Sequence, residues 1–264
     1  MPKAKEKKGN LGLVIAFLSV VIGLIILSFA LKAFFVIKDS KFDGVHKFNV
    51  FLRGNNETDI VSFSPSAGSI SILKLDNFID NPAESLNVPI DGAISVKGNL
   101  NVKNLSSIFI KSEFPFDSVV KNLTSIDLIR LAFFARTVNA NAISVREFSG
   151  GLSDSQKNTM ISLSFSDPTI YQENMSVQIV NATSVNGLGA KLASFITNIG
   201  GNPILVSSSD IEQKKSKILY DGDMSYTVKK LSSYFNIPAE KTDKKGIADV
   251  IIVIGDDLSD MSKF

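Results

Sequence analysis

The longest apolar block of the chain lies near its N-terminus. From Leu11 to Leu31 the sequence LGLVIAFLSVVIGLIILSFAL contains no charged residue. At 1.5 Å per residue, this length matches the ~30 Å core of a bilayer, and it predicts a transmembrane helix over residues 11–37. A cleaved signal peptide is the alternative: Ser28-Phe29-Ala30 resembles a cleavage site, although signal peptides have a shorter apolar region of about 7–15 residues.

Lysines flank this apolar block unevenly. Four precede it and three follow it: Lys3, Lys5, Lys7 and Lys8, against Lys32, Lys38 and Lys41. The positive-inside rule therefore favours a cytoplasmic tail over residues 1–10. We expect a single-pass protein of the cell membrane, with a linker over residues 38–46 and everything after it extracytoplasmic.

Residues 47–148 carry short apolar segments with β-rich composition. A Pro- and Gly-containing turn at residues 64–68 separates two such runs and predicts a hairpin over residues 58–76. The segment at 124–138 has helical periodicity, and Thr124 and Asp127 resemble a capping box at its start. These features predict a small α+β domain with further strands at 47–54, 93–98, 106–110 and 142–148.

A Gly- and Ser-rich stretch at residues 149–158 predicts a break, and residues 159–175 predict a strand and a connector. The elements then alternate as strand 176–181, helix 187–199, strand 203–208, strand 217–220, helix 223–235 and strand 249–254. This βαββαβ order closes into a four-stranded sheet with both helices on one face, a two-layer sandwich. The predicted fold class is therefore α+β, with a domain at 176–257 and a short tail at 258–264.

Composition excludes several classes of function. Lys plus Arg number 28 and Asp plus Glu 26, a balance that disfavours a nucleic-acid partner. The absence of cysteine excludes disulfides, cysteine metal sites and cysteine nucleophiles. The single histidine, His46, lies in the predicted linker, so we expect it to be solvated and expect no Ser-His-Asp triad.

The segment from Asn181 to Gly189 resembles the loop of a nucleotide-binding fold, since it connects a strand to a helix through glycines. A dinucleotide fingerprint needs a third glycine, where this chain has Leu192, and no P-loop string occurs. We therefore expect no cofactor. Asn181 and Thr183 would turn the chain, Gly187 would relieve crowding and Gly189 would allow close packing. A cap from Ser184 or Asn186 is expected at the helix start.

Asp256 and Asp257 follow the last predicted strand. A carboxylate pair can hold a metal ion, but a solvated strand end with polar caps is the simpler explanation of these residues. We interpret the pair in the second way and expect no metal.

Residues 176–257 resemble the LytR C-terminal domain family. The matching strings are VQIVNATSVNGLGAKLASFITNIGGNPILVSSSD, SKILYDGDMSYTVKKLSSYFNI and ADVIIVIGDD. The resemblance implies a bacterial cell-envelope protein and implies no particular reaction.

Shorter strings in residues 47–148 are similar to a reduced LytR–CpsA–Psr domain: KFNVFLRG, ETDIVSFSPSAGSISILKLD and LNVPIDGAISV. Full domains of that family transfer polymers from polyprenyl pyrophosphate to the wall, using carboxylate-held Mg²⁺ and an arginine cluster. Asp59 and Asp76 match the carboxylate positions and are remnant catalytic candidates. The family's Ser-Ile-Pro-Arg-Asp string is Ile72-Leu73-Lys74-Leu75-Asp76 here, without its arginine.

Two hypotheses follow from these resemblances. In the first, the protein is a non-catalytic, membrane-anchored module whose C-terminal domain binds a cell-wall polymer or an envelope partner protein. In the second, it is a divergent polymer transferase that uses Asp59 and Asp76. A transcriptional regulator is disfavoured because a cytoplasmic tail over residues 1–10 cannot hold a DNA-binding domain.

Overall fold

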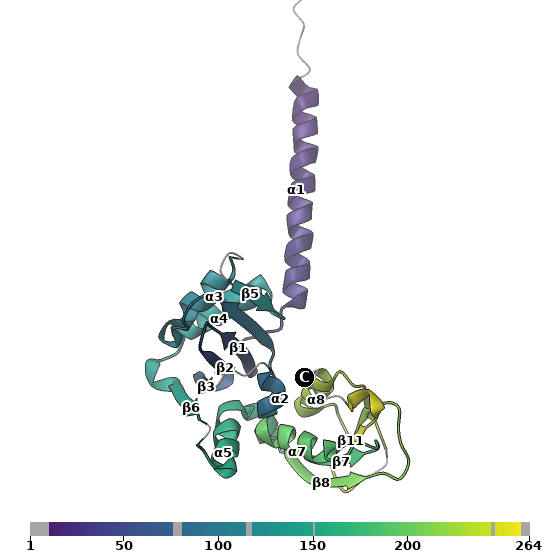
Figure 1. Cartoon of the computed structure of the whole chain (residues 1–264). Coiled ribbons are helices and arrows are strands. Elements are labelled where there is room, and N and C mark those ends of the chain that lie inside the picture. Colours follow the sequence, from purple (N-terminus) through teal and green to yellow (C-terminus); the bar gives the residue numbers. More distant parts are fainter. Residues whose placement is uncertain (1–10, 76–80, 115–117, 150, 244–245, 260–264) are drawn as a thin grey trace, which may run out of the picture.

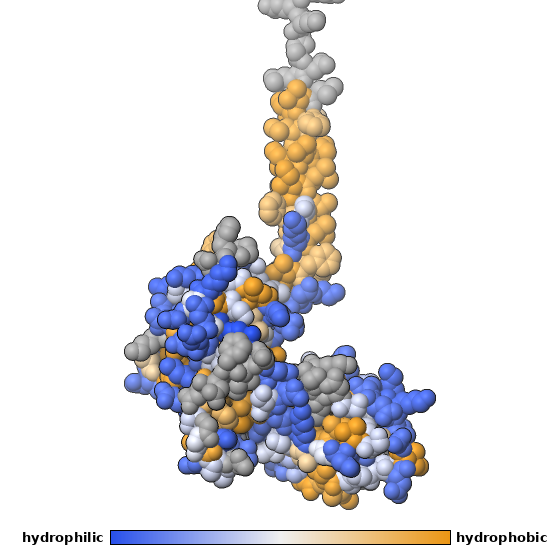
Figure 2. All heavy atoms as spheres, in the orientation of Figure 1, coloured by the Kyte–Doolittle hydropathy of each residue, from blue (hydrophilic) through white to orange (hydrophobic). Residues whose placement is uncertain are grey.

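The computed structural model describes residues 11–75, 81–114, 118–149, 151–243 and 246–259. Helix α1 (Leu11–Asp39) projects away from the rest of the chain, and its surface is apolar (Figures 1 and 2). Among the described residues it is the one helix long and apolar enough to cross a membrane, by length and composition alone. A signal sequence at an N-terminus would share these properties. The helix continues through Lys38 and Asp39, which the sequence assigned to the linker.

In the described part of the chain, six strands form a mixed sheet that follows α1. The strand order is β5-β4-β1-β2-β3-β6. The predicted hairpin is confirmed, because β2 and β3 pair antiparallel with Phe63 opposite Ile70 and Ile60 opposite Leu73. Gly68, at the turn, has φ 60°, which glycine adopts without a steric penalty. The strands are β1 (Phe48–Arg53), β2 (Thr58–Ser64), β3 (Ser69–Leu75), β4 (Gly92–Val96), β5 (Ser118–Lys121) and β6 (Ile143–Phe148).

Both faces of this sheet are covered, which is why every residue of β2 is buried. Successive side chains of a strand point to opposite faces. Val61 and Phe63 therefore join the core under helices α3 (Leu105–Ser112) and α4 (Ser125–Thr137). Ile60 joins a second core, which contains residues of α2 (Pro82–Leu86) and α5 (Asp154–Phe165). We call β1 to β6 with α2, α3 and α4 the middle unit. Short 3-10 turns lie at Pro65–Ala67, Val102–Asn104 and Ala140–Ala142.

Helix α4 begins as its sequence predicts. The Thr124 side chain accepts a hydrogen bond from the Asp127 backbone N–H, and Asp127 accepts from Thr124 in return, so the capping box is confirmed. Asp127 is fully buried. Its other oxygen accepts hydrogen bonds from the Ser40 hydroxyl (2.7 Å) and from the backbone of Lys41 and Phe42 (2.9 and 2.8 Å). The end of α1 is thereby fastened to the middle unit.

Three predictions of secondary structure are wrong. Residues 106–110 belong to helix α3, not to a strand, because Asn104 caps the Ser107 N–H and the apolar residues Leu105, Ile108 and Phe109 recur with helical spacing. Helix α5 (Asp154–Phe165), which starts with a Ser153–Gln156 capping box, replaces the second half of the expected break at 149–158 and the strand expected after it. The expected connector contains helix α6 (Pro168–Glu173).

The C-terminal unit, from α6 to residue 259, has the predicted βαββαβ order and the α+β fold class. Helices α7 (Leu188–Asn198) and α8 (Tyr226–Phe235) share one core with buried strand residues such as Ile179 and Ile252, so both lie on one face of the sheet. The sheet has an extra strand, with order β10-β9-β11-β7-β8 in the described residues. The strands are β7 (Ser176–Asn181), β8 (Asn202–Ser208), β9 (Lys217–Tyr220), β10 (Ala239–Lys241) and β11 (Val250–Ile254).

Hydrogen bonds join the two units beside α2. The Asn87 side chain donates to the Lys191 carbonyl (2.6 Å), and the Asn198 side chain donates to the Asn87 carbonyl (3.0 Å). The Lys191 ammonium also lies 3.6 Å from the Glu84 carboxylate. These contacts place α7 against the middle unit, next to α2 (Figure 1).

Candidate functional site

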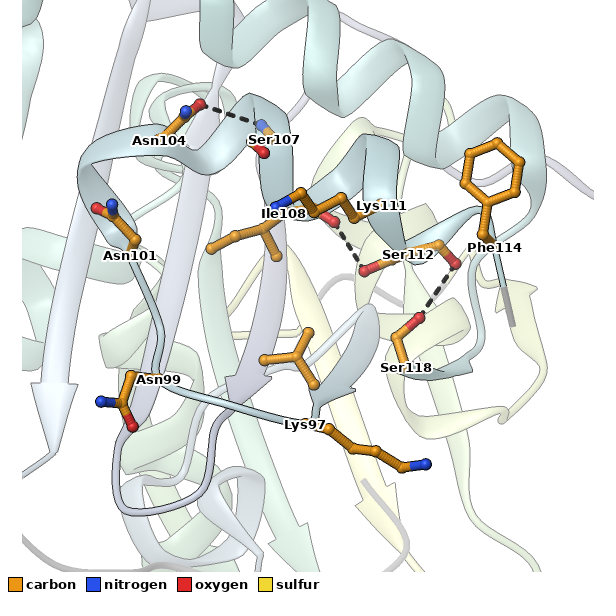
Figure 3. Close-up of a pocket in the computed structure, with 11 residues that line it drawn as sticks. Lys97, Asn99, Asn101, Asn104, Ser107, Ile108, Lys111, Ser112, Phe114 and Ser118 are labelled. Atoms are coloured by element: carbon orange, nitrogen blue, oxygen red, sulfur yellow. Dashed lines mark hydrogen bonds between the residues drawn. The ribbon is translucent and has the colours of Figure 1, made fainter. Parts of the chain in front are cut away.

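A cavity of about 560 Å³ opens in the middle unit between the end of β4, helix α3 and the start of β5. Figure 3 shows the side chains around it, which come from the 96–101 segment on one side and α3 on the other. We call it the α3 pocket. Its lining residues are Val96, Lys97, Asn99, Asn101, Asn104, Ser107, Ile108, Lys111, Ser112, Phe114 and Ser118.

Local hydrogen bonds fix one rim of this pocket. The Asn55 backbone N–H donates to the Gly98 carbonyl (2.9 Å), and the Gly98 N–H donates to the Asn55 side chain (3.2 Å). The Leu100 N–H donates to the Glu57 carboxylate (3.0 Å). The loop after β4 is therefore held against the loop between β1 and β2.

The opposite rim is set by α3. Asn104 accepts from the Ser107 N–H (3.2 Å), while the Ser112 hydroxyl donates to the Ile108 carbonyl (2.8 Å) and the Ser118 hydroxyl donates to the Ser112 carbonyl (3.4 Å). The two serine hydroxyls thus already have acceptors within the chain. Asn99 and Asn101, both exposed, leave side-chain amides at the mouth of the pocket.

Both charged side chains among the described residues that line the α3 pocket are positive. Lys97 and Lys111 are both exposed, and no aspartate or glutamate occurs among the described residues that line the pocket. Ile108 and the exposed ring of Phe114 add apolar surface. Ammonium groups, amides and an aromatic ring together suit an anionic ligand that also carries hydroxyl groups, such as an anionic saccharide. Sequence reasoning missed this site because residues 106–110 were assigned to a strand.

Asp59 lies on β2 in a different, smaller cavity of about 260 Å³. Its side chain is buried and lies opposite Lys74 across the β2–β3 pair. Burial raises the pKa of Asp59 to about 6, while the Lys74 charge lowers it and the Glu57 charge raises it. A carboxyl with a pKa of about 6 gains and loses its proton close to neutral pH, so this geometry is compatible with proton transfer.

The other parts of a transferase centre are not assembled around Asp59 in the described residues. Asp76, the second candidate carboxylate, lies outside them. No arginine is among the described residues lining this cavity, and Arg130 donates instead to the Phe42 carbonyl (3.0 Å) near α1. Within the described ranges, no group of three or more His, Cys, Asp or Glu side chains is placed to hold a metal ion.

The loop after β7 is built by hydrogen bonds among its own residues. The Asn181 side chain donates to the Val185 carbonyl (2.9 Å) and accepts from the Thr183 N–H and hydroxyl (3.2 and 2.8 Å). The expected cap from Ser184 or Asn186 is wrong: Gly187 occupies the N-cap position of α7 without a side-chain hydrogen bond, at φ 85°. That left-handed backbone lets the chain enter the helix without a capping side chain.

Gly189 lies where α7 meets the sheet. A Cβ atom at this position would lie 2.7 Å from Val206 Cγ1 on β8. This distance is shorter than van der Waals contact, so the glycine permits the close approach of helix and strand.

The two strand-end aspartates have different surroundings. The Asp257 carboxylate accepts from the Ser216 N–H (2.8 Å) and hydroxyl (2.7 Å). Burial alone would raise the pKa of Asp257, but these hydrogen bonds and Lys215 outweigh it and lower the pKa. The Asp256 side chain is exposed, and its backbone N–H donates to the Gln213 carbonyl. Both residues help to position the 213–216 loop beside the 3-10 turn at Asp256–Leu258.

Comparison with known proteins identifies one region of the chain. Residues 174–258 match the family model described as LytR cell envelope-related transcriptional attenuator, which confirms the resemblance of residues 176–257 to the LytR C-terminal domain. None of the curated proteins compared with the chain matches it.

Two solved structures from Listeria show weak likeness. A fragment (residues 52–321) of Lmo1026 from Listeria monocytogenes, described as a candidate transcriptional factor, is 13% identical; the match covers 46% of this chain and 86% of that one, with a TM-score of 0.28. Lin1025 from Listeria innocua is 11% identical; the match covers 81% and 94%, with a TM-score of 0.17. Scores this low carry no argument about fold or function. The match to the LytR C-terminal family implies a role related to the cell envelope, and the apolar N-terminal helix fits anchoring to a membrane.

Proposed function

We propose that this protein is a non-catalytic, membrane-anchored envelope protein that binds an anionic cell-wall polymer in the α3 pocket. The observation that supports this most is the charge of the pocket: Lys97 and Lys111 lie among amide groups, with no acidic residue among the described residues that line it. From the sequence we expected the C-terminal unit to bind a cell-wall polymer or an envelope partner protein. We place polymer binding in the middle unit because the pocket is there.

The position of the pocket relative to α1 also supports the proposal. Helix α3 and strand β5, which border the pocket, lie on the side of the middle unit from which α1 projects (Figure 1). With the N-terminus in the cytoplasm and the rest outside, the pocket would face the space next to the outer surface of the membrane. A polymer attached to a lipid or to the inner layers of the wall would be within reach there.

A sedimentation assay with purified bacterial cell walls tests the proposal. The full chain in detergent micelles is mixed with walls before and after hydrofluoric acid extraction, which removes phosphodiester-linked polymers. We expect retention on untreated walls, and at least fivefold less retention after extraction or with the double variant Lys97→Gln/Lys111→Gln. The matched control Lys229→Gln/Lys241→Gln removes two exposed lysines of the C-terminal unit and should bind like the unmodified chain. Equal retention of both double variants, or no retention at all, would disprove polymer binding in this pocket.

The second candidate function is a divergent polymer transferase centred on Asp59. The observation in its favour is the buried carboxyl with a pKa of about 6 inside a cavity. If this function is correct, polyprenyl pyrophosphate with Mg²⁺ will raise the melting temperature of the chain, and Asp59→Ala will abolish the rise. No shift with the unmodified chain would rule this candidate out.

A further inference from the structure

A second cavity, of about 440 Å³, lies where the segment after α1, the middle unit and the C-terminal unit meet. We call it the junction cavity. Ligand sites occur preferentially at such junctions between units. Its lining residues are Lys41, Phe48, Pro89, Ile90, Asp91, Phe195, Lys230, Ser233 and Tyr234.

One wall of the junction cavity carries a fixed carboxylate. The Asn49 backbone N–H donates to Asp91 Oδ2 (2.7 Å), and the Asp91 N–H donates back to the Asn49 carbonyl (2.9 Å). The buried Asn49 side chain also donates to the Pro89 carbonyl (3.1 Å). These bonds hold the Asp91 carboxylate in one orientation at the edge of β4.

This carboxylate has no direct ionic partner in the described residues, since no lysine, arginine or histidine nitrogen forms an ion pair with it there. Burial raises the pKa of Asp91, and the charge of Asp167 adds to this rise, while Lys230, the Asn49 N–H and Lys41 lower the pKa. The ammonium of Lys230 instead lies over the ring of Tyr234, 5.1 Å from its centre. The cavity therefore separates one carboxylate from two ammonium groups.

The remaining lining is mixed: Ser233 and Tyr234 carry hydroxyl groups, and the apolar residues come from different units. Phe48 belongs to β1 and Phe195 to α7, and both are almost fully buried; Pro89 and Ile90 complete this surface. A ligand with only one kind of charge would leave part of the cavity uncompensated. A small molecule with an ammonium group, a carboxylate and a short hydrocarbon side chain would match the carboxylate, the two ammonium groups and the apolar part of the lining.

We propose that the junction cavity binds a free amino acid or a short peptide in its zwitterionic form, with its ammonium group and its carboxylate both unblocked. The ligand's ammonium group pairs with Asp91, its carboxylate lies near Lys230 and Lys41, and its side chain contacts Phe48 and Phe195. This site is separate from the α3 pocket and takes a different chemical class of ligand, so it goes beyond the polymer binding proposed above.

The contacts around the cavity indicate what binding would do. His46, in the segment after α1, is stacked on Tyr226 of α8 with ring centres 4.2 Å apart, and the Tyr226 hydroxyl donates to Asp167 (2.9 Å). The Lys47 ammonium donates to the Ser166 carbonyl (2.9 Å). A ligand that contacts Lys41, Asp91 and Lys230 at once would strengthen the same junction and fix the C-terminal unit relative to the membrane anchor.

Isothermal titration calorimetry with alanyl-alanine tests this inference on the full chain in detergent micelles. The L,L and D,D forms are both used, because the inference does not depend on chirality. We expect saturable binding of at least one form. N-acetylation of that form should weaken binding at least tenfold because it removes the ammonium group, and C-amidation should weaken it similarly because it removes the carboxylate.

Variants locate the binding. Asp91→Asn retains an acceptor for the Asn49 N–H but loses the charge, and Lys230→Gln removes the opposite charge; each should weaken binding at least tenfold. Lys229→Gln, the adjacent exposed lysine of α8, should leave binding unchanged. If Asp91→Asn does not fold, Lys230→Gln and the two blocked dipeptides decide the question. No saturable binding at millimolar concentration, or equal binding of the N-acetylated dipeptide, would overturn the inference whatever the cell-wall assay shows.

Discussion

The side-chain amide of Asn198, near the end of α7, donates a hydrogen bond to the backbone carbonyl of Asn87, which follows α2 in the middle unit. The distance is 3.0 Å, and the Asn198 side chain is buried. A second, longer bond reaches the Leu86 carbonyl (3.3 Å). One amide group thus connects two units that are remote in the sequence.

We expect Asn198→Ala to weaken this junction. The substitution leaves buried carbonyl groups without a donor, which costs about 1–3 kcal/mol. Hydrogen exchange measured by mass spectrometry should show that the free energy of local opening in α2 and α7 falls by about 1–3 kcal/mol. Thr197→Ala is the control, because the exposed Thr197 hydroxyl bonds only to Ala193 within its own helix. Equal protection in the two variants would mean that Asn198 does not couple the units.

The contact of Asn198 with Asn87 also shows what the sequence could not predict. The capping box of α4 and the order of the C-terminal elements were predictable, because each depends on residues a few positions apart. Helix α3 was missed because Ser-Ser-Ile-Phe-Ile is β-rich in isolation, while the cap from Asn104 and packing against α4 decide its conformation. Strand β10 is only 3 residues long and has no pattern of its own. Both cavities require contacts between distant segments, so no local pattern indicates them.

Asp127 should make stability depend on pH. Burial alone would raise its pKa, but hydrogen bonds from Thr124, Phe42 and Ser40 outweigh it and lower the pKa below the usual value. An acid with a lowered folded-state pKa stabilises the fold above its unfolded pKa of about 3.9, and this stabilisation is lost as the pH falls further. Asp127→Asn should lower the free energy of unfolding at pH 7 by roughly 2–3 kcal/mol, since charge-assisted bonds are lost.

Urea denaturation at pH 7, 5 and 3.5 measures this effect. The difference between the unmodified chain and Asp127→Asn should be similar at pH 7 and 5 and smaller at pH 3.5. Ser125→Ala changes an exposed residue of the same first turn and should have little effect at any pH. A difference that does not change with pH would show that the Asp127 charge contributes nothing.

Asp59 should have the opposite effect on the pH dependence of stability. Burial raises its pKa to about 6, so the folded state disfavours the ionised form. The stability penalty begins as the pH rises through the unfolded pKa of about 3.9 and is complete above pH 6. Asp59→Asn should therefore raise the melting temperature more at pH 7.5 than at pH 4.5. A lower melting temperature at pH 7.5 would mean that the charged carboxylate has a stabilising partner in the fold.

Gly189 should tolerate alanine better than leucine. An alanine Cβ would lie 2.7 Å from Val206 Cγ1, but Val206 lies on the edge strand β8 and is 45% exposed, so it can shift. Alanine also favours the helix by about 1 kcal/mol relative to glycine, which offsets the crowding. Leucine should destabilise the C-terminal unit by roughly 1–3 kcal/mol through overpacking. In urea denaturation, Val206→Ala should restore part of the free energy of unfolding that Gly189→Leu loses. If it restores none, the leucine side chain clashes with residues other than Val206.

The loop from Asn181 to Gly189 should bind no nucleotide, because its polar groups already bond to one another. The Asn181 side chain forms hydrogen bonds with Val185 and Thr183. Gly187 is the N-cap residue of α7 and has a left-handed backbone, with φ 85°. Gly187→Val should destabilise the C-terminal unit by about 1–2 kcal/mol, the cost of a left-handed backbone in a residue with a side chain. Ser184→Ala should have little effect, since Gly187 occupies the N-cap position. In thermal melts, neither ATP nor NAD should change these differences. Micromolar, saturable binding of either nucleotide, lost in a Gly187→Val chain that still folds, would show that the loop is a nucleotide site after all.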